Sequence, residues 1–234
     1  MKRITFQLLL FCCLCIGTTL FGQNNPSNIS LTGDQVDINQ MHWRGIGPYR
    51  GGRANAISGV IGQEEVYYAG YTGGGLWKTI DGGANWFNLS DGFFTTSSIG
   101  DIAVSTKDPN VVYVGSGEHA VRGVMTTYGD GIYKSTDAGK TWKNIGLEKT
   151  RHISDVLIHP DNPEKVYVGA QGAVHGASKE RGVYISDDGG QNWRQTLYVD
   201  ENTGVSSLMM DPSNPRILYA ATWDHRRLPW KVIS

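Results

Sequence analysis

The chain has 234 residues, with 21 Lys and Arg against 22 Asp and Glu, and 39% of its residues are hydrophobic. This length and composition are typical of a globular protein and exclude a chain that is disordered throughout. Its 31 glycines make up about 13% of the residues against a usual ~7%, and aromatic residues reach 10%. The combination favours many short strands joined by tight turns over a helical bundle.

The first 22 residues have the features of a secretory signal peptide. Lys2 and Arg3 precede an apolar stretch at residues 8–16, and Gly22 offers a small residue for cleavage before Gln23. The apolar stretch is too short to span a bilayer comfortably. All three cysteines lie within it, so the mature chain would contain neither a disulfide nor a thiolate site. We expect a protein secreted to the periplasm or the cell exterior, without a stable membrane span.

Cleavage would leave 19 basic and 22 acidic groups, a net charge of about −3. This balance gives no support for nucleic-acid binding, which normally requires a basic excess. Residues 23–42 are polar, rich in Asn, Ser and Gln, and without a sustained hydrophobic period, as is typical of a flexible leader. The folded part is expected to occupy residues 43–234.

Beyond the leader, the chain contains three copies of the pattern S/T-x-D-x-G-x-x-W. Each copy follows a glycine, an aliphatic residue and an aromatic residue at a fixed offset, and successive aspartates are 56 and 51 residues apart. A repeat of this length indicates a protein built from similar units in series. The repeated positions are Thr79, Asp81, Gly83 and Trp86, then Ser135, Asp137, Gly139 and Trp142, and finally Ser186, Asp188, Gly190 and Trp193.

Each period also contains two alternating apolar segments separated by a turn with Asp-Pro or Asn-Pro. With the segments on either side of the aspartate, these predict four antiparallel strands per ~50 residues, which is the size of one β-propeller blade. Blades are predicted at about residues 53–89, 99–145 and 153–197, with a fourth that begins at 205 and stops near its third strand. The predicted fold is all-β, an incomplete propeller of three blades and part of a fourth, which continues into further blades in a full-length chain.

The repeated aspartates allow a structural and a functional interpretation. In a tight Asp-Gly or Asp-Ala-Gly corner, glycine adopts a positive φ, the carboxylate accepts backbone N–H groups and the Ser or Thr hydroxyl adds a bond. The alternative is a metal-binding or catalytic carboxylate. We favour the turn, with the tryptophan on the fourth strand packed against a neighbouring strand.

These repeats resemble the Asp-box, or BNR, repeats of sialidases, xyloglucanase-type glycoside hydrolases and the luminal domain of sortilin. Together with segments 43–48, 51–53, 115–118 and 199–204, they make residues 43–234 similar to the N-terminal part of large secreted bacterial proteins described as glycosyl hydrolases or sortilin-like BNR proteins. The resemblance implies a β-propeller but no particular activity, because enzymes and non-enzymes share Asp boxes.

In a four-stranded blade, the loops between the second and third strands and the loops between blades emerge on one face, opposite the proline turns and the aspartate corners. We call it the loop-bearing face. Loops on a rigid scaffold are where binding groups tend to lie. The candidate ligand-binding residues on this face are Arg50, Arg53, Tyr71, Glu118, His119, Arg151, His152, His175, Asp200, Glu201, Trp223, Asp224 and His225.

Carboxylates, guanidinium groups and aromatic rings on one surface suit a carbohydrate, and they suit a peptide equally well. Four candidate histidines lie in separate loops without short ligand spacing, so a zinc site would require these loops to converge. The sequence contains no cofactor motif and predicts no metal centre.

Glycoside hydrolysis requires two carboxylates that flank the scissile bond, and the predicted loops offer Glu118, Asp200, Glu201 and Asp224. Xyloglucanase-type enzymes, which this chain resembles, carry a catalytic aspartate just before the glycine pair that follows the second strand. The resemblance would place that aspartate near residues 71–73 of this chain. This chain has no acid at the corresponding residues 71–73.

The resemblance to sialidases is also incomplete, because Arg50 is followed by two glycines rather than by Ile-Pro. The leading hypothesis is therefore a secreted propeller that binds a glycan or a protein. One alternative is a glycoside hydrolase whose catalytic set is completed by further blades. The other is a sortilin-like receptor that binds peptides.

Overall fold

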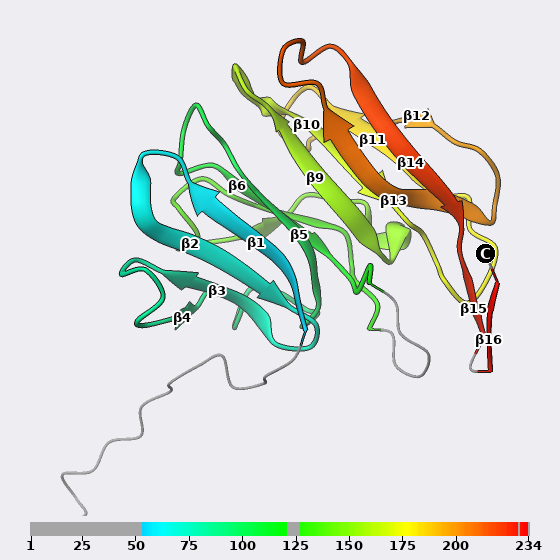
Figure 1. Cartoon of the computed structure of the whole chain (residues 1–234), viewed down its shortest axis with the longest axis horizontal. Coiled ribbons are helices and arrows are strands. Elements are labelled where there is room, and N and C mark those ends of the chain that lie inside the picture. Colours follow the sequence, from blue (N-terminus) through cyan, green and yellow to red (C-terminus); the bar gives the residue numbers. More distant parts are fainter. Residues whose placement is uncertain (1–52, 121–126, 229, 234) are drawn as a thin grey trace, which may run out of the picture. The chain divides into compact units, whose positions relative to one another are not determined.

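Figure 1 shows the computed structural model, which describes residues 53–120, 127–228 and 230–233. These residues belong to one unit that extends from Gly45 to Ser234. The predicted signal peptide, the predicted leader and Arg50 lie outside the described residues. No helix in the described part is long and apolar enough to cross a bilayer.

Three successive sheets each contain four antiparallel strands in chain order. The first sheet consists of β1 (Ala54–Val60), β2 (Gln63–Tyr71), β3 (Gly75–Thr79) and β4 (Phe87–Asn88). The second consists of β5 (Ile99–Val104), β6 (Val112–Ser116), β7 (Ile132–Ser135) and β8 (Lys143–Asn144). A short 3-10 helix, η2 (Glu148–Thr150), leads to the third, which consists of β9 (Ile153–His159), β10 (Asn162–Ala170), β11 (Gly182–Ser186) and β12 (Arg194–Leu197). The predicted all-β fold with four-stranded blades is confirmed.

The last part of the chain differs from the prediction. β13 (Thr203–Met210) pairs with β14 (Leu218–Asp224) alone, and β15 (Arg226–Leu228) and β16 (Lys231–Ile233) form a separate two-stranded sheet. The fourth sheet thus contains two strands rather than almost three. β14 is also longer than predicted, because Thr203 pairs with Asp224 and extends the ladder beyond the apolar segment.

The first strands of successive blades contact one another, β1 with β5, β5 with β9, and β9 with β13 (Figure 1). A glycine in the second strand of each of the first three blades, Gly70, Gly115 or Gly169, makes room for this contact. A Cβ atom on Gly70 would overlap the Ile99 side chain of the next blade, and a Cβ atom on Gly115 would overlap Ile153 in the same way. The repeated glycines therefore permit close packing between sheets.

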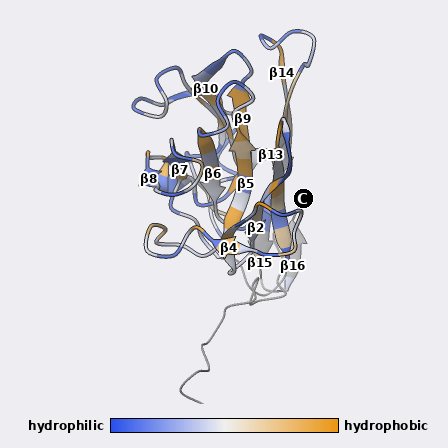
Figure 2. Cartoon of the chain, turned by 90° about the vertical axis from the view of Figure 1, so that its left-hand side faces the viewer, coloured by the Kyte–Doolittle hydropathy of each residue, from blue (hydrophilic) through white to orange (hydrophobic). Residues whose placement is uncertain are grey.

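The hydrophobic core lies between neighbouring blades. Apolar residues concentrate on the strands, while hydrophilic residues occupy the connecting loops (Figure 2). Tyr68 and Leu76 of the first blade pack with Ile102 of the second, and Tyr113 of the second packs with Val156 of the third. Since each cluster draws on two sheets, each blade depends on its neighbour for burial, as in other repeat proteins.

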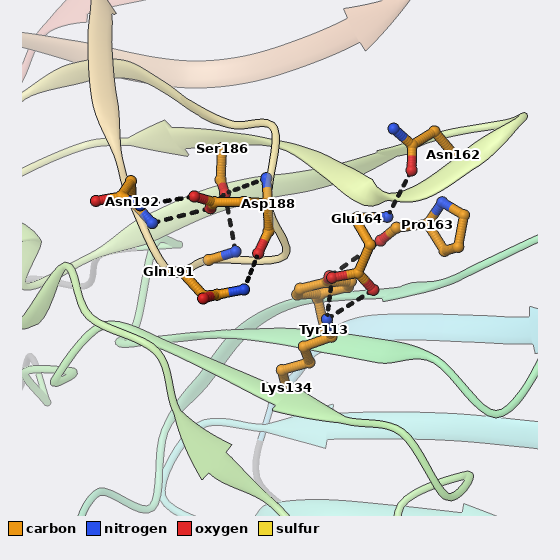
Figure 3. A network of polar contacts seen from close by, with 10 residues as sticks. Tyr113, Lys134, Asn162, Pro163, Glu164, Ser186, Asp188, Gln191 and Asn192 are labelled. Carbon is orange, nitrogen blue, oxygen red and sulfur yellow. Dashed lines mark hydrogen bonds and ion pairs between the residues drawn. The ribbon is translucent and has the colours of Figure 1, made fainter.

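The aspartate corners contain the same set of hydrogen bonds in all three blades. In the third, Ser186 Oγ donates to Asp188 Oδ1 at 2.8 Å and accepts the Gly190 N–H at 2.8 Å (Figure 3). Asn192 donates its backbone N–H to Oδ1 at 2.9 Å and its side-chain amide to Oδ2 at 2.7 Å. Thr79 with Asp81, and Ser135 with Asp137, make matching contacts. These contacts engage both carboxylate oxygens within the turn.

The tryptophans of the repeat lie one residue before the fourth strand of each blade rather than within it. In the first two blades the indole N–H is bonded within the corner: Nε1 of Trp86 donates to the Gly83 carbonyl and Nε1 of Trp142 to the Gly139 carbonyl, both at 3.1 Å. Trp142 is buried in the core between the first two blades. Trp193 donates instead across the interface to the Ile145 carbonyl of the preceding blade, at 2.8 Å.

The aspartate corners lie beside the turns between the first and second strands, as predicted. The Gly189 N–H donates to the Glu164 carbonyl at 2.7 Å, and equivalent bonds join the two turns in the other blades. This end of the molecule also connects the blades, since Lys134 Nζ forms an ion pair with Glu164 at 2.8 Å (Figure 3). The Tyr113 hydroxyl donates to the Pro163 carbonyl of the third blade at 3.0 Å (Figure 3). The longer loops lie at the opposite end of the blades.

Candidate ligand-binding site

The loops of the loop-bearing face contact one another across three blades. Thr96, between the first two blades, donates its hydroxyl to the Tyr128 carbonyl in the β6–β7 loop at 2.8 Å. The N–H of Gly129 in that loop donates to the Arg151 carbonyl at 2.7 Å. Arg151 directly follows η2, which joins the second and third blades. The predicted loops therefore form a continuous surface.

A cavity of about 410 Å³ opens between the β2–β3 loop and the β4–β5 loop. Two aromatic side chains, Trp77 and Phe94, line it together with polar residues and glycine backbone. The polar lining includes Asn88, Asp91 and Thr96. Sequence analysis placed candidate residues near this loop but did not identify the cavity, because its walls come from segments that are separated along the chain.

Local contacts hold the cavity walls in place. Trp77 donates its indole N–H to the Gly74 carbonyl at 2.7 Å, and the Phe94 ring stacks on Tyr133 of the second blade with centroids 3.9 Å apart. Asn88 Oδ1 accepts the Asp91 N–H at 2.8 Å. Both aromatic rings are thus fixed before any ligand arrives, which lowers the entropic cost of binding.

The lining of the cavity combines aromatic rings with polar groups. Aromatic rings lie beside hydroxyl, amide and carboxylate groups; Trp77 is 6% exposed, and Phe94 is half-buried with one face on Tyr133. Asp91 is the only carboxylate among the described lining residues, whereas glycoside hydrolysis requires two. Tyr71, a candidate from the sequence, is the last residue of β2 and not a loop residue, because it pairs with Gly75 across the hairpin.

A second group of side chains gathers around Tyr128, which sequence analysis missed. The Tyr128 ring is 39% exposed, and Cζ of Arg151 lies 5.2 Å from its centroid. The rings of His152 and His175 lie 5.2 Å and 6.0 Å from it. Tyr128 thus brings together three candidate residues predicted from the sequence, Arg151, His152 and His175. In the sequence, Tyr128 stood out only as an aromatic residue in a long loop.

His152 lies beneath this group and is fully buried. Neither of its ring nitrogens has a hydrogen-bond partner among the described residues. Burial, followed by the charges of His175, His225, His119 and Arg181, lowers the pKa of His152 to about 3. The imidazole is therefore neutral at physiological pH. It packs near the Tyr128 ring on the side of the protein interior and does not contact solvent.

Arg181, also fully buried, ties together the loops of the third and fourth blades. Its Nε donates to the Glu201 carbonyl at 2.8 Å and its Nη1 to the Gln171 carbonyl at 2.5 Å. Nη2 donates to the carbonyls of Ala173, Gly176 and His225. These bonds satisfy the guanidinium group with backbone oxygens from three segments, so we assign Arg181 a structural part in the site.

Two of the predicted acids have structural partners. The buried Glu118 side chain forms an ion pair with Arg53 and accepts the Thr127 N–H at 3.3 Å. Asp200 accepts the N–H groups of Asn202 and Thr203 at 2.7 Å and 2.8 Å, which closes a turn. Glu118 therefore lies inside the protein, whereas Asp200 stays exposed while its carboxylate closes this turn.

The remaining candidates are distributed over the same end of the molecule. Glu201 and Asp224 are exposed, while His119 is half-buried, with Nδ1 3.1 Å from the Gly100 carbonyl. His225 is buried beside Trp223, whose ring centroid lies 4.6 Å away. Trp223 and Asp224 belong to β14 and not to a loop. In residues 53–120 and 127–228, no group of three or more His, Cys, Asp or Glu side chains could hold a metal ion.

Two half-buried carboxylates on the first strands also escaped sequence analysis. Asp101 Oδ2 accepts the Val156 N–H at 2.7 Å, and Asp155 Oδ2 accepts the Leu208 N–H at 3.0 Å. Burial raises the pKa of Asp101 to about 7. In sequence, a polar residue in an alternating strand indicates a solvent-facing position, whereas here each carboxylate joins its blade to the next.

Comparisons with known proteins agree with this architecture. Residues 130–228 match the family model described as sortilin, neurotensin receptor 3. A sequence comparison with curated proteins gives no match. Among solved structures, an ancestral GH74 enzyme is similar with a TM-score of 0.58 and 18% identity, covering 76% of this chain and 23% of the enzyme.

Two further structures are similar. The GH74 xyloglucanase from Xanthomonas campestris has a TM-score of 0.55 and 18% identity, over 77% of this chain and 29% of the enzyme. An auxiliary nutrient binding protein from Bacteroides thetaiotaomicron has a TM-score of 0.50 and 14% identity, over 73% of this chain and 36% of that protein. This chain thus corresponds to less than a third of the length of either GH74 enzyme. It is an incomplete β-propeller with the fold of GH74 enzymes and similarity to sortilin, as the sequence predicted.

Proposed function

We propose that this chain is part of a secreted carbohydrate-binding propeller and that a sugar unit occupies the cavity between Trp77 and Phe94. The single observation that carries the proposal is the composition of that cavity, in which two fixed aromatic rings lie beside amide, hydroxyl and carboxylate groups. Its volume of about 410 Å³ falls within the ~300 to 1,000 Å³ range of small-ligand sites.

The proposed role is binding and not hydrolysis. Asp91 is the only described carboxylate in the lining, and Glu118 is engaged by Arg53 and by a backbone N–H. A lone carboxylate can accept hydrogen bonds from sugar hydroxyls, but it cannot supply both groups that glycosidic cleavage needs. Release of reducing sugar from a bound glycan would overturn this part of the proposal.

The test is a glycan array with the secreted protein, followed by calorimetric titration of the oligosaccharides that bind. Two variants change the cavity: Asp91→Ala removes its carboxylate, and Ser97→Trp fills it from an exposed lining position. The matched control is Asp161→Ala, which removes an exposed carboxylate next to a turn on the opposite face. We expect both cavity variants to weaken binding at least tenfold and the control to bind normally. Binding that survives both cavity variants would contradict the assignment.

The family match at residues 130–228 favours a second candidate, a peptide-binding receptor. That segment includes Arg151, His175 and Arg181 but not the lining of the cavity. A peptide library screened against the same protein distinguishes the two. Peptide capture that is insensitive to Ser97→Trp, with no glycan bound, would favour the receptor.

A further inference from the structure

The surface around Tyr128 adjoins the proposed sugar cavity. Thr96 lines that cavity and donates its hydroxyl to the Tyr128 carbonyl at 2.8 Å. Thr95, another lining residue, hydrogen-bonds through its hydroxyl to Asp130 in the same β6–β7 loop. A ligand longer than one sugar unit would therefore extend from the cavity onto the residues around Tyr128.

This neighbouring surface offers positive charge. Arg151 is exposed and lies over the Tyr128 ring, and it forms no ion pair with any described residue. Asp130, an acid of the same loop, is held by hydroxyl groups: it accepts the Tyr133 O–H at 2.5 Å and the Ser116 O–H at 3.2 Å. A cation on an aromatic face keeps its N–H edge available for an anion.

The buried His152 lies behind the Tyr128 ring and backs this surface. Its ring lies 5.2 Å from the Tyr128 ring, is fully buried, and has two nitrogens without a hydrogen-bond partner among the described residues. A buried N–H without an acceptor is costly. Because the ring is fully buried, a ligand on this surface would contact Tyr128 and Arg151 rather than His152.

Arg151 itself is held in an unusual backbone conformation. Its φ of 63° and ψ of −50° place a non-glycine residue in a region that L-amino acids rarely occupy. The N–H of Gly129 donates to its carbonyl at 2.7 Å, which helps to hold this conformation. Strain of this kind is found where a side chain must be aimed at a ligand.

We propose that Tyr128, Arg151 and His175 bind an anionic group, a carboxylate or a sulfate, on an acidic glycan whose adjacent unit occupies the cavity. The inference rests on the proposed carbohydrate-binding function and specifies its ligand. Arg151 pairs with the anion through its N–H groups, the Tyr128 ring positions the guanidinium group, and His175 borders the site. We favour a glycan over an acidic peptide because the surface around Tyr128 and Arg151 adjoins the cavity that we propose binds a sugar unit.

The experiment compares matched ligands on the full chain. Oligogalacturonate is titrated beside its carboxyl-reduced counterpart, and a sulfated oligosaccharide beside its desulfated form. We expect one anionic member to bind roughly tenfold or more tightly than its neutral partner at low ionic strength. The advantage should decrease as salt is added, since exposed charges are screened.

Variants locate the effect. Arg151→Gln should abolish the preference for the anionic member while retaining the affinity for the neutral one, and Arg151→Lys should restore part of it. The control is Arg194→Gln, which removes an exposed arginine on β12 that lies 3.7 Å from Asp187. Unfolding curves of both Arg151 variants should match the wild type, which separates lost charge from lost structure.

The outcomes separate the two proposals. Equal affinity for anionic and neutral glycans, or a preference that survives Arg151→Gln, would overturn the acidic-glycan inference and leave carbohydrate binding intact. Absence of binding to any glycan would overturn both. Tight binding of acidic peptides without glycan binding would also overturn both, in favour of the receptor.

Discussion

The carboxylate of Asp101 accepts a hydrogen bond from the Val156 backbone N–H at 2.7 Å and so joins the first strands of two successive blades. The same contact recurs one blade later, between Asp155 and the Leu208 N–H at 3.0 Å. Each bond crosses from one sheet to the next. The blades are therefore held together by partly buried polar contacts as well as by the apolar core.

The first prediction concerns pH. Burial raises the pKa of Asp101 from 3.8 to about 7, so the folded protein favours the protonated form. The stability that this group contributes is fully present below pH ~4 and is lost as the pH rises towards 7. Asp101→Asn, which cannot ionise, should flatten this part of the pH profile of the free energy of unfolding.

Urea unfolding of both proteins between pH 4 and 7.5 measures the effect as a difference. His152 acts in the opposite direction, because its pKa is lowered from 6.5 to about 3, and stability is lost as the pH falls below 6.5. That contribution is common to both proteins and cancels in the comparison. Parallel profiles for wild type and Asp101→Asn would show that Asp101 is ionised throughout.

The second prediction concerns packing between blades. A Cβ atom on Gly115 would overlap Ile153 of the next blade, so Gly115→Ala should destabilise the protein by ~1 to 3 kcal/mol through overpacking. Gly176→Ala is a control for the loss of a glycine, since its Cβ would meet nothing within 4 Å and, like Gly115, it has no positive φ.

The double variant Gly115→Ala with Ile153→Ala tests whether the clash itself is responsible. Alanine at 153 removes Cγ2, the atom nearest to the added Cβ, so the combined change in unfolding free energy should be smaller than the sum of the single changes. Strict additivity, measured by denaturant unfolding, would mean that Gly115 is required for a reason other than contact with Ile153.

The third prediction concerns the corner of the second blade. Ala138 has a φ of 58°, whereas glycine occupies the equivalent positions of the other blades, Gly82 and Gly189, with φ of 66° and 70°. Ala138→Gly should stabilise the protein by up to ~1 kcal/mol, because glycine adopts this conformation without a Cβ clash. Its hydrogen bonds through the backbone carbonyl, from Tyr68 and Lys78, need no side chain.

Thermal unfolding of Ala138→Gly against Ala84→Gly checks this prediction. Ala84 lies in the corner of the first blade without a positive φ, and glycine there should only add flexibility to the unfolded chain. A lower melting temperature for Ala138→Gly than for Ala84→Gly would be contrary to the expected relief of strain.

The repeats predicted the blades because each aspartate corner determines its own geometry. Ser186, Asp188 and Asn192 form all their corner bonds within a few residues of one another, so the pattern could be interpreted locally. The site could not be predicted in this way. Tyr128 and Arg151 are separated by more than a strand pair, and their contact depends on how two loops pack on the finished scaffold.

Burial was the other property that the sequence could not provide. Glu118 and His152 were candidates because polar residues in loops usually face water, yet both side chains lie inside the protein. Asp101 was overlooked because an isolated polar residue in a strand resembles a solvent-facing position. In each case the neighbouring blade supplies the covering atoms, and the repeat pattern does not specify that interface.

The last prediction separates the two ends of the molecule. Asp137 Oδ1 accepts the Thr141 N–H at 2.9 Å, and Oδ2 accepts the Thr141 hydroxyl. Asp137→Ala leaves these donors without their partner and should lower the free energy of unfolding by ~1 to 3 kcal/mol. Ligand affinity of the folded fraction should not change, because the corner lies on the face opposite the cavity. Asp91→Ala, at the cavity, should behave in the reverse way, with stability retained and binding reduced. Denaturant unfolding measures the stability of both variants, and calorimetric titration measures their affinity for the ligand. Loss of binding by Asp137→Ala under conditions where the variant is fully folded would show that the aspartate corners take part in ligand binding.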